Sequence, residues 1–362
     1  MEHSTYDPLS PLKIREVYTS LQDDISRVVF NARLLYYLSG DKKHMDNMLN
    51  KLNDMGRIGN SKTIMDFLHD KSLHEKKIIL YGAGCIGCIV FQMLKEKGIQ
   101  VFAYCDSNKD KQGNQFMGLR IISTEELLSE NEDAEILIST ATYSNEILNQ
   151  LKRMGVQAER VYTAGSFSEE YFGENLIPAV ENEVYIDVGV WDGHSISRFL
   201  NFCGYKYKKI YGLEPDPANW EKSEKWIKQN NVSNVTLVQK GAWSCNTSLA
   251  FDEDKLYGGE GSRISQNGDL QVEVTTIDEL VGHEIITLIK MDIEGAELEA
   301  LKGAENTIKK NKPRLMICVY HKAEDILTIP LYLKSLVPEY RFFIRHHGLG
   351  YPYVGTVLYA AV

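Results

Sequence analysis

Four polar residues stand where predicted strands of one α/β unit end, and their chemistry suits a shared ligand site. They are two aspartates, a glutamate and a histidine: Asp187, Glu214, Asp292 and His321. In open α/β sheets ligands bind outside the carboxyl ends of the strands, so neighbouring strand ends bring such side chains together. One acid at such a position means little, but four convergent strand ends predict a site.

The first of these strands leads into a glycine turn that begins with an acid, Asp187-x-Gly189-x-x-x-Gly193. Glycines let the backbone approach a ligand closely, and Glu214 can accept hydrogen bonds from both hydroxyls of a ribose. A Gly-x-Gly-x-x-Gly turn would favour a dinucleotide, whereas this acid-first spacing favours S-adenosyl-L-methionine. The helix that starts at His194 would hold the cofactor's carboxylate at its N-terminus.

The rest of the cofactor is assigned from the same strand ends. We expect its sulfonium near Asp187 and Asp292, and its adenine beside the loop Gly241-Ala242-Trp243. Trp243 either stacks on the adenine or belongs to the core.

Methyl transfer to a hydroxyl needs in-line geometry and a group that takes the proton. His321 is the predicted base because its ordinary pKa of about 6.5 suits neutral pH. Asp292 is the alternative, either as base or as the residue that orients His321. Two structural interpretations stay open: His321 could be a hydrogen-bonded histidine without a proton role, and Asp292 and Glu294 could cap the following helix.

A divalent metal held by Asp292, Glu294 and His321 is conceivable from the residue types. However, an Asp-x-Glu segment in extended conformation points its two carboxylates to opposite faces. The prediction is therefore no metal.

These residues belong to a predicted α/β domain over residues 175–362 with seven strands, of which the last two form an antiparallel pair. This pattern is typical of class I methyltransferases. The predicted strands are Val184–Val188, Ile210–Leu213, Val235–Gln239, Leu288–Met291, Leu315–Tyr320, Arg341–Arg345 and Thr356–Ala360.

Several motifs in this domain resemble the FkbM-type family of S-adenosylmethionine-dependent methyltransferases. They are Ile186-Asp-Val-Gly189, Gly212-Leu-Glu-Pro215, Thr276-Ile-Asp-Glu279, Lys290-Met-Asp-Ile-Glu-Gly-Ala-Glu-Leu298, Leu301-Lys-Gly-Ala304, Val319-Tyr-His-Lys322 and Arg345-His-His347. The resemblance implies O-methyl transfer, commonly to hydroxyls of sugars, glycans or secondary metabolites. Trp191 and His194 depart from the small or hydroxyl residues that would fit more easily. Glu294, Arg345 and His346 are candidates for recognising the acceptor, and a solvated rim is the alternative for the last two.

A second, smaller α/β unit is predicted over residues 73–168 and is Rossmann-like. Gly82-x-Gly84-x-x-Gly87 follows a strand and opens a helix, and Asp106 ends the next strand near the spacing expected for an acid on a ribose. The unit resembles the nucleotide-binding domains of sugar-nucleotide-processing proteins. A nucleotide or nucleotide-sugar, a redox role and a platform without ligand all stay open.

Residues 1–72 are predicted as helices, with a break at Gly40-Asp41, that pack on another domain or on a second subunit. The chain has 362 residues, a formal net charge of −10 and 25% charged residues, which fits an ordinary globular protein and disfavours a nucleic-acid partner. Its six cysteines lack a zinc pattern and predict buried free thiols. The absence of a signal sequence and of a membrane span predicts a cytoplasmic protein, for which a homo-oligomer is compatible.

The leading function from sequence is an O-methyltransferase that acts on a small-molecule or glycan acceptor. The competing functions are an NAD(P)-dependent sugar-nucleotide oxidoreductase that uses the first α/β unit, and a non-catalytic nucleotide-binding scaffold.

Overall fold

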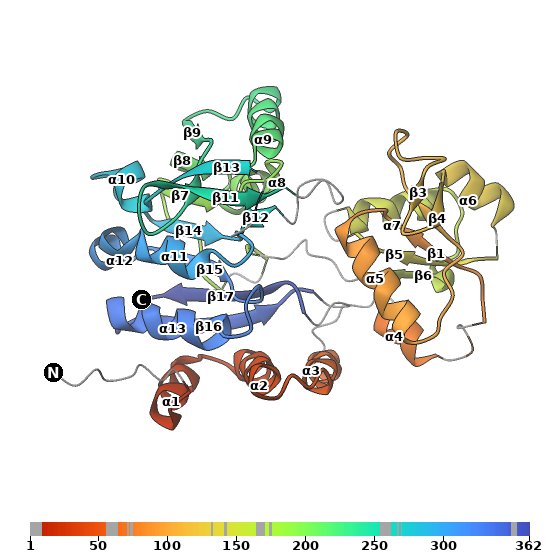
Figure 1. Cartoon of the computed structure of the whole chain (residues 1–362), viewed down its shortest axis with the longest axis horizontal. Helices are drawn as coiled ribbons and strands as arrows, with labels where there is room; N and C mark the ends of the chain where they lie inside the picture. Colours follow the sequence, from red (N-terminus) through yellow and green to blue (C-terminus); the bar gives the residue numbers. More distant parts are fainter. Residues whose placement is uncertain are drawn as a thin grey trace.

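The structure is a computed structural model in which two α/β units are preceded by helices (Figure 1). It describes residues 9–55, 64–70, 72, 75–131, 133–140, 143–163, 171–173, 176–253, 262–265, 268, 270–348 and 353–362. The predicted fold class, α/β with two units, is confirmed.

The N-terminal helices break at Gly40, as predicted, and also between Ser20 and Asp24, which was not predicted. They are α1 (Pro11–Ser20), α2 (Asp24–Ser39), α3 (Lys43–Asp54) and α4 (Ile64–His69). The side chain of Asp23 accepts a hydrogen bond from the Ser26 amide at 2.8 Å and so caps α2. Gly40 ends α2 in the left-handed conformation, with φ of 67°.

These helices divide between the two units. α1 packs on α13 (Asp325–Leu336) and α2 on β16 (Arg341–His346), so α1 to α3 lie along the second unit (Figure 1). α4 packs on the first unit, where the rings of Phe67 and Tyr162 are 5.3 Å apart. Helices predicted as one segment therefore stabilise two different cores.

The first α/β unit has a six-stranded sheet in the order β3-β4-β2-β1-β5-β6. All pairings are parallel except that of β3 with β4. The elements are β1 (Ile78–Tyr81), α5 (Cys85–Glu96), β2 (Ala103–Cys105), β3 (Gln115–Phe116), β4 (Leu119–Ile122), α6 (Thr124–Glu130), β5 (Glu135–Ile138), α7 (Ser144–Arg153), the 3₁₀ helix η2 (Ala158–Arg160) and β6 (Val161–Thr163). The hairpin of β3 and β4 was not predicted, and its turn has positive φ at both Met117 and Gly118.

The second unit contains the predicted seven-stranded sheet, in the order β16-β17-β15-β14-β7-β8-β9. Its strands are β7 (Glu183–Val188), β8 (Tyr207–Leu213), β9 (Val235–Val238), β14 (Leu288–Met291), β15 (Arg314–Cys318), β16 and β17 (Thr356–Ala361). β17 is antiparallel to both β15 and β16, and the other pairs are parallel. The helices of this unit are α8 (His194–Phe202), α9 (Pro217–Gln229), α10 (Ile277–Val281), α11 (Glu297–Lys302), α12 (Glu305–Asn311) and α13.

A four-stranded sheet between β9 and β14 was not predicted. Its order is β10-β13-β11-β12, with β10 (Gly241–Ala242), β11 (Thr247–Asp252), β12 (Arg263–Ile264) and β13 (Leu270–Thr275). In β13 the apolar residues Val272 and Val274 are buried, while Gln271 and Glu273 between them are exposed. This alternation is a strand signal that could have been found in the sequence.

The cysteines for which the structure describes a side chain are free thiols. Cys105, Cys203 and Cys318 are buried, as predicted. Cys245 is exposed and Cys88 is half-buried, so the prediction of buried thiols was wrong for these two. The side chain of Cys85 lies outside the described part of the structure.

Along the described ranges, no helix combines the length and the apolar character that crossing a bilayer requires.

Candidate functional site

A cavity of about 460 Å³ opens at the carboxyl ends of β7, β8, β14 and β15. Among its lining residues are six of the predicted site residues: Gly189, His194, Glu214, Ala242, Asp292 and His321. Glu294 lines it as well. The strand ends therefore meet as the sequence predicted, and the volume is in the range of small-molecule sites.

The glycine turn after β7 is packed tightly against the end of β14. Gly189 has φ of 83°, and a Cβ added to it would lie 2.1 Å from the carbonyl oxygen of Asp292. Gly193 has φ of 91°, and a Cβ there would lie 2.9 Å from the ring of Trp226. Gly193 therefore permits helix packing and does not itself line the cavity, whereas Gly189 does.

This packing predicts that Gly189→Ala lowers the free energy of unfolding by at least about 2 kcal/mol, because the new methyl group meets backbone and the φ value suits glycine. Urea unfolding measures the loss. Gly84→Ala is the matched control, since a Cβ added at Gly84 meets nothing within 4 Å. Equal stability of the two variants would contradict the argument.

Helix α8 starts at His194, which lines the cavity together with Ser195 and Arg198. The Nδ1 atom of His194 lies 2.9 Å from Oδ2 of Asp192, and this hydrogen bond raises the pKa of His194 despite partial burial. The helix N-terminus and a protonated imidazole together favour an anion.

Asp187 lies behind the wall of the cavity, not at its surface. It is fully buried, with its carboxylate 3.2 Å from the ammonium group of Lys290. Lys290 lines the cavity and donates a hydrogen bond to the carbonyl of Gly189 at 2.8 Å. Burial alone would lower the pKa of Lys290, but the carboxylates of Asp187 and Asp292 raise it. Asp187 thus acts on the turn through Lys290, and this placement argues against its predicted contact with a cofactor.

Glu214 ends β8 and is 5% exposed. Its two carboxylate oxygens accept hydrogen bonds from the amides of Trp191 at 2.9 Å and Asp216 at 3.0 Å. Burial raises the pKa of Glu214 to about 7, although these two hydrogen bonds lower it. The carboxylate is fixed in position at the cavity, and each oxygen retains a lone pair for a hydroxyl donor.

The third strand end contributes an apolar wall. Gly241 and Ala242 of β10 line the cavity beside Phe251 of β11. Trp243 packs instead with Phe251 and Val274 in the core of the small sheet, which favours the core interpretation for this tryptophan.

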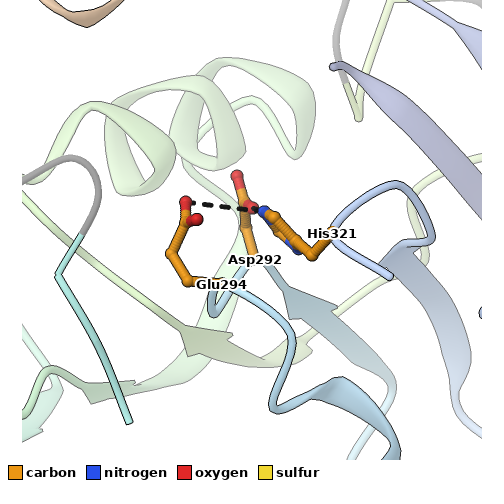
Figure 2. Close-up of side chains that lie close together, drawn as sticks. All are labelled: Asp292, Glu294 and His321. Carbon is orange, nitrogen blue, oxygen red and sulfur yellow. Dashed lines mark ion pairs between the residues drawn. The ribbon is translucent and has the colours of Figure 1, made fainter. Parts of the chain in front are cut away.

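Asp292, Glu294 and His321 converge on one point of the cavity (Figure 2). The Nε2 atom of His321 lies 3.4 Å from Oδ1 of Asp292 and 3.5 Å from Oε1 of Glu294. The expectation that Asp292 and Glu294 point apart was wrong, because the segment turns at Glu294, where φ is 54°. Neither acid caps α11, whose N-cap residue is Ala296 without a side-chain hydrogen bond.

The opposite side of the imidazole contacts a third carboxylate. Nδ1 of His321 lies 2.8 Å from Oε1 of Glu297, whose side chain is fully buried. Burial alone would lower the pKa of His321, but Glu297 and Glu294 raise it well above its ordinary value. Burial alone would raise the pKa of Asp292, but His321 and Lys290 lower it. The cluster therefore concentrates negative charge around one imidazole ring.

Three groups in this region were not predicted. The hydroxyl of Tyr171 donates to Oδ2 of Asp292 at 2.8 Å, and the hydroxyl of Tyr320 lies 3.3 Å from Oδ1 of the same carboxylate. Tyr171 lies between the two predicted units, in a segment to which the sequence assigned no functional role. From the first unit, Ile86 and Ile89 of α5 line the cavity. No sequence signal connects α5 to the second unit, since this contact depends on how the two units pack.

Two of the three motif glycines of the first unit, Gly82 and Gly87, are explained by packing within it. A Cβ added to Gly87 would lie 2.2 Å from the carbonyl oxygen of Gly82, and one on Gly82 would lie 2.9 Å from that of Ser139. Asp106 accepts a hydrogen bond from the Ala83 amide at 3.0 Å and lies 3.1 Å from the ammonium of Lys111. These contacts favour the platform interpretation for Gly82, Gly87 and Asp106 over a nucleotide site, whereas a Cβ added to Gly84 meets nothing within 4 Å.

Arg345 and His346 lie outside the cavity lining and are buried. Arg345 forms an ion pair with Asp23 at 2.6 Å and so joins β16 to the start of α2. The ring nitrogens of His346 lie 3.0 Å from Oγ1 of Thr356 and from the carbonyl of Gly348. The predicted acceptor role and the solvated-rim alternative are both corrected, because Arg345 holds α2 on the sheet and His346 is buried against Thr356 of β17 and Gly348.

This role predicts that Arg345→Ala lowers the free energy of unfolding by about 1.5–3 kcal/mol, because it removes the charge-assisted hydrogen bonds between the buried guanidinium and the partly exposed Asp23. Thermal and urea unfolding measure the loss, with the exposed Arg341 of the same strand as the control, Arg341→Ala. An acceptor role would show the reverse pattern, with unchanged stability and a raised KM.

Two regions of the chain match known protein families. Residues 187–351 match the family described as methyltransferase FkbM domain, and residues 74–162 match the one described as C2185-like, N-terminal. Residues 187–351 of the second unit thus match a methyltransferase domain of FkbM type, in agreement with the motifs. The match of the first unit carries no ligand, and its predicted resemblance to sugar-nucleotide-processing proteins is not confirmed.

Individual relatives are distant. The chain is 24% identical over 143 residues to hexuronic acid methyltransferase AglP of Haloferax volcanii, an overlap of 38% of this chain and 58% of that protein. It is 24% identical over 161 residues to Methyltransferase 1 of Beauveria bassiana, covering 36% of this chain and 62% of that protein. A crystal structure of methyltransferase FkbM from Methylobacillus flagellatus aligns with 88% of this chain and 100% of its own, at 20% identity and a TM-score of 0.48. The chain thus spans about three fifths of the length of these two curated relatives.

Proposed function

We propose that this protein transfers the methyl group of S-adenosyl-L-methionine to a hydroxyl group of a sugar, with a sugar acid or related glycan as the acceptor class. The proposal rests on one observation, which joins the family match to the cavity. The matched FkbM region, residues 187–351, contains the strand ends whose polar side chains line one cavity: Glu214, Asp292 and His321.

The proposed cofactor position uses the fixed groups of the cavity. Glu214 accepts the ribose hydroxyls, and the adenine lies beside Ala242 and Phe251, where the wall is apolar. The cofactor's carboxylate lies at the start of α8, by His194 and Ser195, because unpaired helix amides favour an anion. Gly189 lets the backbone approach the methionine portion, and the sulfonium faces Asp292.

The proposed chemistry is a single displacement. The acceptor oxygen forms a bond to the methyl carbon as the carbon–sulfur bond breaks, and the bonding pair stays on sulfur. The hydroxyl proton passes to water on the side of the cavity formed by Asp292, Glu294 and His321, where the negative charge of the cluster favours its departure. Alignment of the two substrates supplies a large part of the rate enhancement.

Two features support an acidic sugar as acceptor. One curated relative is named for hexuronic acid methylation. In addition, Arg198 and Arg263 line the cavity, and guanidinium groups suit carboxylates. The proposal includes a cytoplasmic location, since the free thiols of Cys88 and Cys245 suit a reducing compartment.

Two measurements on the purified full chain test this function. Calorimetry with S-adenosylhomocysteine should show binding, and NADH, as the control for a dehydrogenase, should not bind. Incubation with methyl-labelled S-adenosylmethionine and a panel of hexuronic acids, their nucleotide-linked forms and the matching neutral hexoses should label an acid-bearing acceptor. Failure to bind S-adenosylhomocysteine would overturn the proposal, and labelling of neutral sugars alone would overturn the acceptor class.

A further inference from the structure

The cluster at the end of β14 has the composition and spacing of a cation site. One ligand atom each from Asp292, Glu294 and His321 lies within 4.8 Å of the others. All three residues line the cavity, and Figure 2 shows their side chains pointing toward one another. Two carboxylate oxygens and one imidazole nitrogen are a common donor set for divalent cations.

The imidazole provides an independent sign of a ligand. The His321 side chain is only 7% exposed. Among the described residues, its Nε2 atom is buried without a hydrogen-bond partner. The carboxylate oxygens at 3.4 and 3.5 Å are farther away than ordinary N–H···O hydrogen bonds, which span about 2.7–3.2 Å. A polar atom held at this depth and aimed between two carboxylates needs something between them.

The outer contacts of the cluster also suit a cation. Metal-binding histidines donate their second ring N–H to a carboxylate, which fixes the tautomer and directs the other nitrogen to the metal. Glu297 occupies this position, 2.8 Å from Nδ1 and fully buried. Likewise the Tyr171 hydroxyl donates to Oδ2 of Asp292 at 2.8 Å, which orients that carboxylate and leaves Oδ1 toward Nε2.

We propose that Asp292, Glu294 and His321 bind a divalent cation of the Mn²⁺ or Mg²⁺ type, with Glu297 and Tyr171 as positioning residues. Three protein ligands leave coordination positions that face the cavity, which is the arrangement of catalytic and not structural metal sites. This replaces the prediction of no metal.

The use of the cation rests on the proposed function. A bound divalent cation lowers the pKa of a coordinated hydroxyl and orients it. Its open positions would take an acceptor hydroxyl, whose proton leaves to water while the oxygen attacks the methyl carbon. An adjacent oxygen of a sugar or sugar acid would complete the chelate.

Mn²⁺ titration of the full chain after removal of metals with a chelator tests the site directly. Loss of the free-ion electron paramagnetic resonance signal measures binding without any methyl donor. The wild type should take up a single ion per chain. Asp292→Asn, Glu294→Gln and His321→Gln should each raise the Kd by tenfold or more, and Glu297→Gln should raise it by roughly 10–100-fold.

Glu299→Gln is the matched control, because Glu299 is a similarly exposed carboxylate on α11 that pairs with Lys302 and Ser244 outside the cluster. Its Kd should equal that of the wild type. Glu294, at 32% side-chain exposure, is the ligand whose replacement is least able to disturb folding, so Glu294→Gln decides the question if the buried variants unfold. No uptake by the wild type at millimolar Mn²⁺, or uptake unchanged in Glu294→Gln, would overturn the site.

The test separates this site from the proposed function. Mn²⁺ uptake without binding of S-adenosylhomocysteine would leave the cation site standing and remove the methyltransferase activity. The opposite result is chelated protein that takes up no Mn²⁺ but still binds S-adenosylhomocysteine and shows full turnover. It would leave the methyltransferase activity standing and remove the cation site.

Discussion

Replacement of His321 by glutamine is expected to lower the turnover number by roughly 10²–10⁴-fold, the range that a general base contributes. The change removes the imidazole that either takes the hydroxyl proton or holds the cation that activates the hydroxyl. The dissociation constant for S-adenosylhomocysteine should stay within about threefold, because the ribose and carboxylate contacts lie at other strand ends. Glutamine retains an N–H group that can reach Glu297, whose side chain is fully buried 2.8 Å from Nδ1. Alanine would instead leave a buried carboxylate unpaired and destabilise the fold.

Single-turnover methylation and calorimetry measure the two quantities on the same preparation. His283→Gln is the control, since His283 is an exposed histidine in the turn after α10, away from the cavity lining. Turnover of His321→Gln within twofold of the wild type would exclude His321 from the reaction, both as base and as cation ligand.

Replacement of Glu214 by alanine is expected to weaken binding of S-adenosylhomocysteine by roughly 10²-fold or more. Hydrogen bonds to a charged group contribute about 1.5–3 kcal/mol each, and two ribose hydroxyls would lose their acceptor. Isothermal calorimetry measures the change. Glu224→Ala, on the exposed face of α9 where Glu224 pairs with Lys228, controls for loss of a carboxylate. Unchanged binding in Glu214→Ala would remove this residue from the site.

The same residue predicts a pH dependence of cofactor binding. Burial raises the pKa of Glu214 to about 7, so the carboxylate is ionised above that pH and becomes protonated below it. The ionised form is the better acceptor for two hydroxyls, so affinity should fall as pH decreases from 8 to 6, by at most about tenfold per unit below the pKa. His194 also titrates near the cavity, and Glu214→Gln separates the two groups. If the pH dependence of the affinity is unchanged in Glu214→Gln, a group other than Glu214 causes it.

The position of the site could be predicted because it depends on strand order. Asp292 and His321 each follow a buried apolar strand, and parallel strands bring such ends to one edge of a sheet. The seven strands were readable as apolar runs, and the antiparallel pairing of the last two was predicted, but the order of the strands in the sheet was not. For Glu214 and Gly189, the local sequence alone was enough to predict that they line the cavity.

The predictions that were wrong or missing concern contacts between distant segments, or a single backbone angle. Arg345 looked like a surface residue, yet Asp23, far away in the sequence, buries it as an ion pair. Tyr171 precedes the first strand of its domain, and nothing in its neighbourhood indicates that it reaches Asp292. The positive φ of Glu294, which turns its carboxylate toward that of Asp292, is uncommon for a residue other than glycine and has no signature in an Asp-x-Glu motif.

The first α/β unit is attached to the second at both of its ends. The helices α1 to α3 before it pack along the second unit, with α2 on β16 and α1 on α13, and Tyr171 after it is buried beside Tyr359 of β17. These two attachments to the second unit limit how far the first unit can move relative to it. Since Ile86 and Ile89 of the first unit form part of the cavity wall, the position of α5 sets part of the shape of the cavity. The wall of the cavity is therefore built by both units, although the matched methyltransferase region lies in the second unit alone.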